Sequence, residues 1–186
     1  MKIINYEQGS DEWISWRKTI TTATDASVIM GVNPYCTLNE LRSRKLGLIP
    51  ETECNAAMQR GKDLEGEARF KFEQECGFPM IPKIVESSEF PFLGASLDGM
   101  CITGKHILEI KCPGKKGMIE AKKGIVKPLY IAQIQHQLLC TNADMCYYYC
   151  YDGAEGHTIE VYPDLEWQKE YIPKAEEFWM SLIFKE

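Results

Sequence analysis

The segment from residue 107 to residue 112 constrains the fold of this chain more than any other. Within it, Glu109 and Lys111 alternate with the apolar residues Leu108 and Ile110. Side chains alternate across a β-strand, so the two charged groups share one face while the apolar pair takes the other. Residues two apart on a strand are separated by roughly 6.5 Å. The pattern predicts a strand that holds an acid and a lysine side by side.

A second acid, Asp98, precedes this strand. Asp98-Gly99 predicts a tight turn just before it, which would bring Asp98 beside Glu109 and Lys111. In that arrangement one group can hold a metal ion and another the water that the ion activates. An ordinary strand with an exposed ion pair has the same acid-x-lysine spacing, so the motif alone leaves both interpretations open.

The rest of the chain predicts one α/β domain, residues 1–186, with helices flanking a small mixed sheet. Ser10 and Thr37 are expected to cap helices, and Thr24-Asp25 to cap a helix over 26–30. Longer helices are expected over 55–76 and 129–140, and from Asp164 onward, with a kink or break near Pro173. Strands are expected near 81–88, 92–95 and 107–112, followed by a hairpin of 145–151 with 157–162.

Glu65 lies on the predicted helix 55–76, seven residues after Met58 and seven before Phe72. Seven residues are nearly two helical turns, so Glu65 is expected to face inward with these two residues. A carboxylate in that position needs a positive partner. Arg69, four residues later, is one candidate, and a metal ion shared with Asp98 and Glu109 is the favoured one.

Three carboxylates suit Mg²⁺ or Mn²⁺, which prefer oxygen ligands. The three histidines form no zinc-ligand pattern, and the eight cysteines include no C-x-x-C pair. Most cysteines are therefore expected to be small buried groups, since their spacing also fits no iron–sulfur pattern. A bound Mg²⁺ would lower the pKa of its water, and Lys111 would favour the hydroxide and contact a phosphate.

The charge distribution leaves two interpretations open. The net charge is −6, yet residues 105–127 contain seven lysines and two glutamates, a local charge of +5. This segment could follow a phosphate backbone or form a solvated lysine-rich loop.

Seven motifs between Trp13 and about Tyr151 resemble, in order, those of the lambda exonuclease family, also called YqaJ-like viral recombinases or phage-type nucleases. They are Trp16-Arg17 with Ile20-Thr21, Thr24-Asp25-Ala26, Gly31 to Tyr35, Ala57-Met58-x-x-Gly61 with Glu65 and Ala68, Ala95 to Gly99, Leu108 to Pro113, and Tyr130 to His136. The acid, short gap and acid-x-lysine pattern is that of the PD-(D/E)xK superfamily. The resemblance therefore implies a restriction-endonuclease-like core.

The resemblance also implies roles for individual residues. Glu65, Asp98 and Glu109 correspond to metal ligands, with the backbone carbonyl of Ile110 as a further one. Lys111 corresponds to the catalytic lysine, and Gln133 to a glutamine beside the active site. Arg17 and Thr24 correspond to residues that contact the 5′-phosphate of DNA, and a helix N-terminus at Thr24 would favour such an anion.

The implied function is an Mg²⁺- or Mn²⁺-dependent exonuclease that degrades linear double-stranded DNA from the 5′ end. In a phage or prophage it would supply 3′ overhangs to a single-strand annealing protein, and the family's ring-shaped homotrimer stays open. The alternatives are an endonuclease with the same core and a non-catalytic module that binds DNA ends. We expect the protein in the cytoplasm of the bacterial host, because no membrane span or secretory signal is evident.

Overall fold

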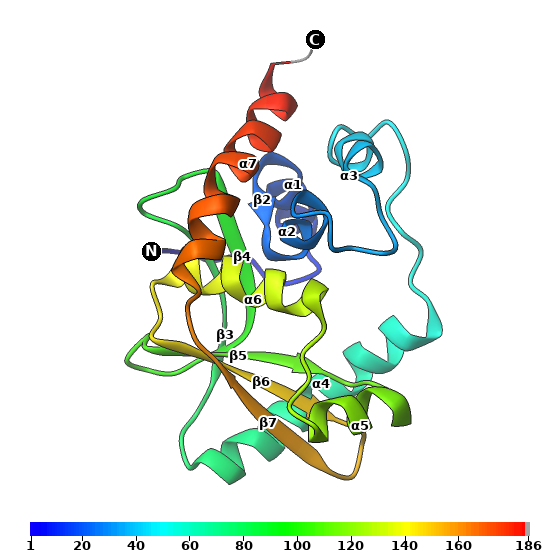
Figure 1. Cartoon of the computed structure of the whole chain (residues 1–186), viewed down its shortest axis with the longest axis vertical. Helices are drawn as coiled ribbons and strands as arrows, with labels where there is room; N and C mark the ends of the chain where they lie inside the picture. The colour runs from blue at the N-terminus through cyan, green and yellow to red at the C-terminus, as the bar shows by residue number, and fades with distance from the viewer. Residues whose placement is uncertain (185–186) are drawn as a thin grey trace.

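The computed structural model describes residues 1–184, so the predicted domain of residues 1–186 ends two residues beyond the described part. One sheet has the strand order β1-β3-β4-β5-β6-β7, with the short β2 paired to β4 (Figure 1). The strands are β1 (Lys2–Ile4), β2 (Thr21–Thr22), β3 (Ile81–Glu86), β4 (Leu93–Met100), β5 (His106–Lys111), β6 (Met145–Tyr151) and β7 (Gly156–Val161). Pairs β5–β6 and β2–β4 are parallel and the other pairs antiparallel, which confirms the predicted mixed sheet.

Helices flank this sheet, as predicted. They are α1 (Asp11–Thr19), α2 (Ala23–Ile29), α3 (Leu38–Lys45), α4 (Ala56–Cys76), α5 (Lys115–Lys122), α6 (Pro128–Thr141) and α7 (Leu165–Ile183). Within residues 1–184, none of these helices combines the length and apolar character that a membrane crossing requires.

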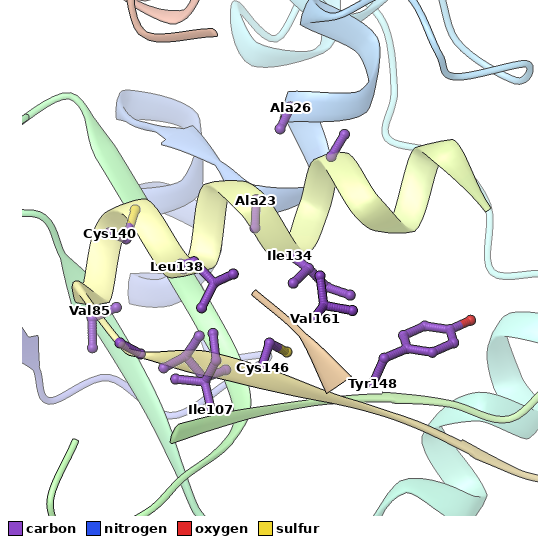
Figure 2. Close-up of a cluster of buried hydrophobic side chains, with 14 of the residues drawn as sticks. Ala23, Ala26, Val85, Ile107, Ile134, Leu138, Cys140, Cys146, Tyr148 and Val161 are labelled. Carbon is purple, nitrogen blue, oxygen red and sulfur yellow. The ribbon is translucent and has the colours of Figure 1, made fainter. Parts of the chain in front are cut away.

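The alternation predicted for β5 is confirmed, because successive side chains of the strand pack into two different hydrophobic cores on its two faces. Leu108 and Ile110 pack in one core with Phe72 of α4. Ile107 packs in the other, with Ile134 and Leu138 of α6. Figure 2 shows the two α6 side chains pointing toward Ile107, while α2 lies against another side of the helix. Glu109 and Lys111, with the same parity as Ile107, therefore belong to the α6 side of the sheet.

Four of the eight free cysteines are buried, where most were expected to be. Of these, Cys140 and Cys146 lie among the apolar side chains of the α6 core (Figure 2), and Cys150 belongs to the same core. Burial raises the pKa of Cys146 well above that of an ordinary thiol, which keeps the thiol protonated. These three side chains thus act as small apolar groups, as the sequence indicated.

Several helix starts follow the predicted capping residues. The side chain of Ser10 accepts the Trp13 N–H at 3.2 Å, as predicted, and that of Asn55, for which no cap was predicted, accepts the Met58 N–H at 2.9 Å. Thr37 and Glu40 form a reciprocal capping box. Asp164 caps α7, which continues through Pro173 without the break that one form of the prediction allowed.

The turn predicted at Asp98-Gly99 is wrong, because both residues lie within β4. Gly99 pairs with Leu108 of β5, and the chain reverses only after Met100. Close packing explains the glycine: a Cβ at position 99 would lie 2.7 Å from Cβ of Met80 and 3.2 Å from that of Leu108. The absence of a side chain is required here by crowding inside the sheet and not by a turn.

Three further expectations need correction. Helix α2 begins at Ala23 because Thr22, rather than Thr24, forms the capping box with Asp25. Met58 is 47% exposed and not part of the core. Part of the lysine-rich segment forms α5, whose Met118 and Ala121 are buried, so it is not simply a loop.

Candidate active site

The site forms where β4 and β5 separate. Backbone pairing between β4 and β5 joins Met100 to Ile107 and Gly99 to Leu108 and goes no further along β5. At Ile110, the carboxylate of Asp98 replaces the backbone acceptor that β4 would otherwise supply. Its Oδ2 accepts the N–H of Ile110 at 2.7 Å. A buried backbone N–H needs such an acceptor, so the splayed strands fix Asp98 beside β5.

Glu109 faces this gap from β5 and is 1% exposed. Its Oε1 forms an ion pair with Nζ of Lys111, and its Oε2 accepts a 2.6 Å hydrogen bond from Nε2 of Gln137 on α6. Nζ of Lys111 also lies 5.1 Å from the ring centroid of Tyr130. The predicted proximity of the acid and the lysine is thus present, with Glu109 buried and Lys111 partly exposed.

The acids of this site lack sufficient positive charge. Burial, with the negative charges of Glu109 and Glu65, raises the pKa of Asp98 well above its usual value, although Lys111 acts in the opposite direction. Burial alone would lower the pKa of Lys111, but the charges of Glu109 and Asp98 raise it above that of an ordinary lysine. Lys111 therefore stays protonated, and its ammonium group lies beside the carboxyl groups of Glu109 and Asp98.

Glu65 on α4 forms an ion pair with Arg69, one of the two positive partners considered for it from the sequence. An Oε1 of Glu65 lies 3.4 Å from an Nη1 of Arg69, and the same nitrogen donates to the backbone oxygen of Asp98 at 2.7 Å. Arg69 thereby ties α4 to β4 at the site. Its role follows from the fold, since the sequence indicated only the i+4 spacing.

The donor set fits a hard divalent cation in chemistry and charge. Asp98, Glu109 and Glu65 offer carboxylate oxygens, and the electrostatics of Asp98 favour an added positive charge. As the side chains stand, no three His, Cys, Asp or Glu groups within residues 1–184 are gathered closely enough to hold a metal ion. Glu109 is engaged by Lys111 and Glu65 by Arg69, so a cation would have to replace these partners.

Helix α6 contributes Gln137, which the sequence did not single out. Gln133, the glutamine implied by the resemblance, is partly buried one turn earlier on the same helix, and its role stays a prediction. Gln137 is fully buried, and its Oε1 has no hydrogen-bond partner within the described chain. The four-residue spacing of the two glutamines was the signal that both share one helix face.

Arg17 and Thr24 lie together, as expected for an anion site. Nη2 of Arg17 lies 3.2 Å from Oγ1 of Thr24, and the guanidinium carbon of Arg17 lies 4.6 Å from the centroid of the Trp13 ring. The Trp13 indole donates to Oγ of Ser96 at 2.8 Å. Ser96 is two residues before Asp98 on β4, so this chain of contacts connects the pair to the acidic site.

A buried ion pair supports the Arg17 side. Nζ of Lys45 lies 2.5 Å from Oδ2 of Asp25 and donates to the backbone oxygens of Arg17 at 2.6 Å and Ile20 at 2.8 Å. The Asp25 carboxylate also accepts the N–H and the hydroxyl of Thr22. One lysine thus holds together the end of α1, the start of α2 and the end of α3.

The segment after β5 is basic and leads away from the site. Among the lysines of residues 105–127, Lys122 pairs with Glu155 at 2.7 Å and Lys127 with Glu120 at 3.5 Å. Lys115, Lys116 and Lys123 are exposed and form no ion pair within the described residues. Their charge is available to an anionic partner.

A mixed sheet whose diverging strands present an acid and an acid-x-lysine pair is the PD-(D/E)xK-like nuclease fold. The structure is similar to an alkaline exonuclease (LHK-Exo) from Laribacter hongkongensis, with 28% identity, a TM-score of 0.82 and coverage of 94% and 93% of the two chains. A phage-related exonuclease from Haemophilus somnus 129PT shares the fold at 17% identity and a TM-score of 0.65, over 88% and 95% of the chains.

Residues 12–144 match the YqaJ-like viral recombinase domain, and the chain belongs to this family. It is also 33% identical over 137 residues to the uncharacterized protein YqaJ of Bacillus subtilis (strain 168). That match covers 72% of this chain and 43% of the longer relative, so the chain spans less than half of the relative's length. The family indicated by the sequence motifs is thus confirmed.

Proposed function

We propose that this chain is a metal-dependent exonuclease that hydrolyses linear double-stranded DNA from the 5′ end. The alkaline exonuclease similarity supports exonuclease chemistry in general. The observation that carries the proposal is the joining of two groups on β4: Asp98 next to Glu109 and Lys111, and Ser96 next to Trp13, Arg17 and Thr24. One group suits hydrolysis of a phosphodiester, and the other suits recognition of a terminal phosphate.

The carboxylates of Asp98, Glu109 and Glu65, with the carbonyl of Ile110, would hold Mg²⁺ or Mn²⁺. The N–H and C=O of a strand residue point to the same side, so this carbonyl points, like the N–H bonded to Asp98, toward the gap left by β4. The ion would supply an activated water and offset charge on the scissile phosphate.

Lys111 remains protonated in this setting and would orient that water and contact a phosphate oxygen. Gln137 holds the second oxygen of Glu109, which fixes the orientation of that carboxylate. Gln133 is proposed to lie along the same helix face as a polar group beside the substrate.

Arg17 and Thr24 would bind the 5′-phosphate of the DNA end. The guanidinium is fixed by the Trp13 ring beneath it and can make a bidentate contact to phosphate. The existence of a structure of LHK-Exo in complex with dAMP supports a site for a nucleoside monophosphate in this fold. Recognition at this end would set the direction of degradation.

We further propose that the 3′ overhangs left by this reaction pass to a single-strand annealing protein during phage or prophage recombination in the bacterial cytoplasm. The family to which the chain belongs, named for viral recombinases, supports this role. The family's homotrimer would let the enzyme remain on one DNA, and size measurement in solution tests that assembly.

Digestion of linear duplex DNA tests the proposal. Duplexes with 5′-phosphate or 5′-hydroxyl ends are incubated with Mg²⁺ or with EDTA, and a covalently closed circle serves as control. We expect mononucleotide release from linear DNA with Mg²⁺, faster from 5′-phosphate ends, and none with EDTA. Cleavage of the closed circle would favour the endonuclease alternative, and end binding without cleavage would favour a non-catalytic module.

A further inference from the structure

Gly61, in the mostly exposed first half of α4, is partly exposed and borders open space. Gly61 lies seven residues before Ala68 and eleven before Phe72, spacings that place all three on one side of the helix. Ala68 is 0% exposed and Phe72 2% exposed against the sheet. Gly61 faces the same direction one turn before Glu65, yet a Cβ at this position would meet nothing within 4 Å.

Folding gives no reason for a glycine at this position. Glycine is less favourable than alanine in the interior of a helix, and Gly61 lies inside α4 without a left-handed backbone conformation. Gly94 and Gly99 are different, because a Cβ there would lie 2.6 Å from the Trp16 ring and 2.7 Å from Met80. Crowding demands those two glycines, whereas Gly61 borders open space.

The elements around this space lead to the acidic site. Arg60 donates to the backbone oxygen of Asp152 in the turn between β6 and β7, and Arg69 donates to the backbone oxygen of Asp98. These contacts hold α4 against the sheet on both sides of Gly61 and Glu65. The end of β5, with Lys111 and Cys112, lies within reach of the charges of Arg60 and Glu65.

We propose that Gly61 keeps open the passage through which the sugar–phosphate backbone of the cleaved DNA strand reaches Lys111. This inference rests on the proposed nuclease function and adds a residue that determines access to its site. Arg60 and Lys111 place positive charge beside the passage, which suits a phosphodiester chain. A side chain at position 61 would enter the space meant for the strand, and its Cβ would meet no protein atom within 4 Å.

Two glycines of the same helix provide a matched test. A Cβ at Gly66 would also meet nothing within 4 Å, but Gly66 is exposed and lies outside the sheet-facing side of α4. The variants Gly61→Ala, Gly61→Leu, Gly66→Ala and Gly66→Leu are compared with wild type. Both alanine variants are expected to raise the midpoint of thermal unfolding, by about 2–4 °C, because alanine favours the helix.

Measurements of cleavage rate and DNA affinity should distinguish substitutions at Gly61 from those at Gly66. For linear duplex, Gly61→Leu is expected to lower kcat/KM by about tenfold to a hundredfold, since small misplacements of a substrate have effects of this size. Gly61→Ala should have a smaller effect in the same direction, and both Gly66 variants should match wild type. Affinity for a DNA end, measured in a Lys111→Ala background, should fall for Gly61→Leu alone.

The outcomes distinguish this inference from the function on which it rests. Equal kcat/KM and equal DNA affinity for the Gly61 and Gly66 variants, with an active wild type, would overturn the passage and leave the nuclease intact. A wild type that neither binds nor cleaves DNA would overturn both. A loss of activity in Gly61→Ala accompanied by a lower unfolding midpoint would also contradict the inference, because it would point to a packing role.

Discussion

Two buried charged clusters of this chain differ in whether their charges balance. In the first, Asp25 and Lys45 form one pair, and each makes further hydrogen bonds to the protein. Burial alone would raise the pKa of Asp25, but Lys45 and the Thr22 amide lower it below the usual value. In the second, burial and neighbouring carboxylates raise the pKa of Asp98 well above that value.

The comparison teaches which cluster serves the fold and which serves chemistry. The Asp25–Lys45 pair is complete within the protein and fixes how α1, α2 and α3 meet, although burial lowers the pKa of Lys45 and so opposes its charge. In the cluster of Asp98, Glu109 and Lys111 the charges are not balanced, as the raised pKa of Asp98 shows, and a perturbed group of this kind is a candidate for chemistry. Three substitutions test this difference, from the largest expected effect to the smallest.

Removal of Lys111 should lower the rate of DNA cleavage strongly and the free energy of unfolding only a little. Lys111→Ala is expected to lower the rate of duplex degradation by about 10²–10³-fold, the usual cost of removing one group that stabilises charge in the transition state. Stability should change less than in Lys45→Met, because the Lys111 side chain is partly exposed and Glu109 keeps its hydrogen bond from Gln137 when Lys111 is lost. Single-turnover cleavage and urea unfolding measure the two effects. Equal product formation by variant and wild type would refute the assigned role.

Removal of Lys45 should have the opposite profile. Lys45→Met leaves the Asp25 carboxylate buried without its partner, and loss of one member of such a pair costs about 3–5 kcal/mol of unfolding free energy. Urea unfolding measures this loss, and the double variant with Asp25→Asn should recover part of it because no unpaired charge remains. A loss below that of a surface control such as Lys174→Met would contradict the structural role.

A third buried titratable group, His136, differs from both charged clusters because burial keeps it neutral. Its Nδ1 lies 2.6 Å from the Tyr171 hydroxyl and its Nε2 lies 2.9 Å from the oxygen of Gly94. Burial lowers the pKa of His136 from 6.5 to about 4. The folded state therefore binds this proton less readily than the unfolded state, and stability present above pH 6.5 is lost as the pH falls toward 4.

The expected contribution of His136 to this loss is up to about 3 kcal/mol, at roughly 1.36 kcal/mol per pKa unit. Wild type and His136→Gln are compared by urea unfolding between about pH 7 and pH 4, where carboxylates titrate in both proteins. The variant should lose unfolding free energy less steeply over this range. Parallel pH profiles would show that His136 does not have the lowered pKa.

Local sequence patterns predicted what depends on near neighbours. The caps at Ser10 and Thr37 form because the bonding partner lies three residues away. The alternation of β5 and the hairpin of β6 with β7 follow from side-chain period and turn residues. Long-range packing explains the error at Gly99: the residue pairs with Leu108 within the sheet, and it is a glycine because Met80 approaches it, a contact that no local pattern reveals.

The sequence by itself determined the family and the set of chemical groups, because motifs in a fixed order carry both. Glu109 and Lys111 were placed on one face by the strand period alone. Only the tertiary structure decided how those groups are used, since their partners come from distant elements. Arg69 turns to Asp98, Gln137 reaches Glu109 from α6, and Gly61 faces open space. Charge balance is a sum over neighbours in space, so the difference between the two clusters appears only in the folded chain.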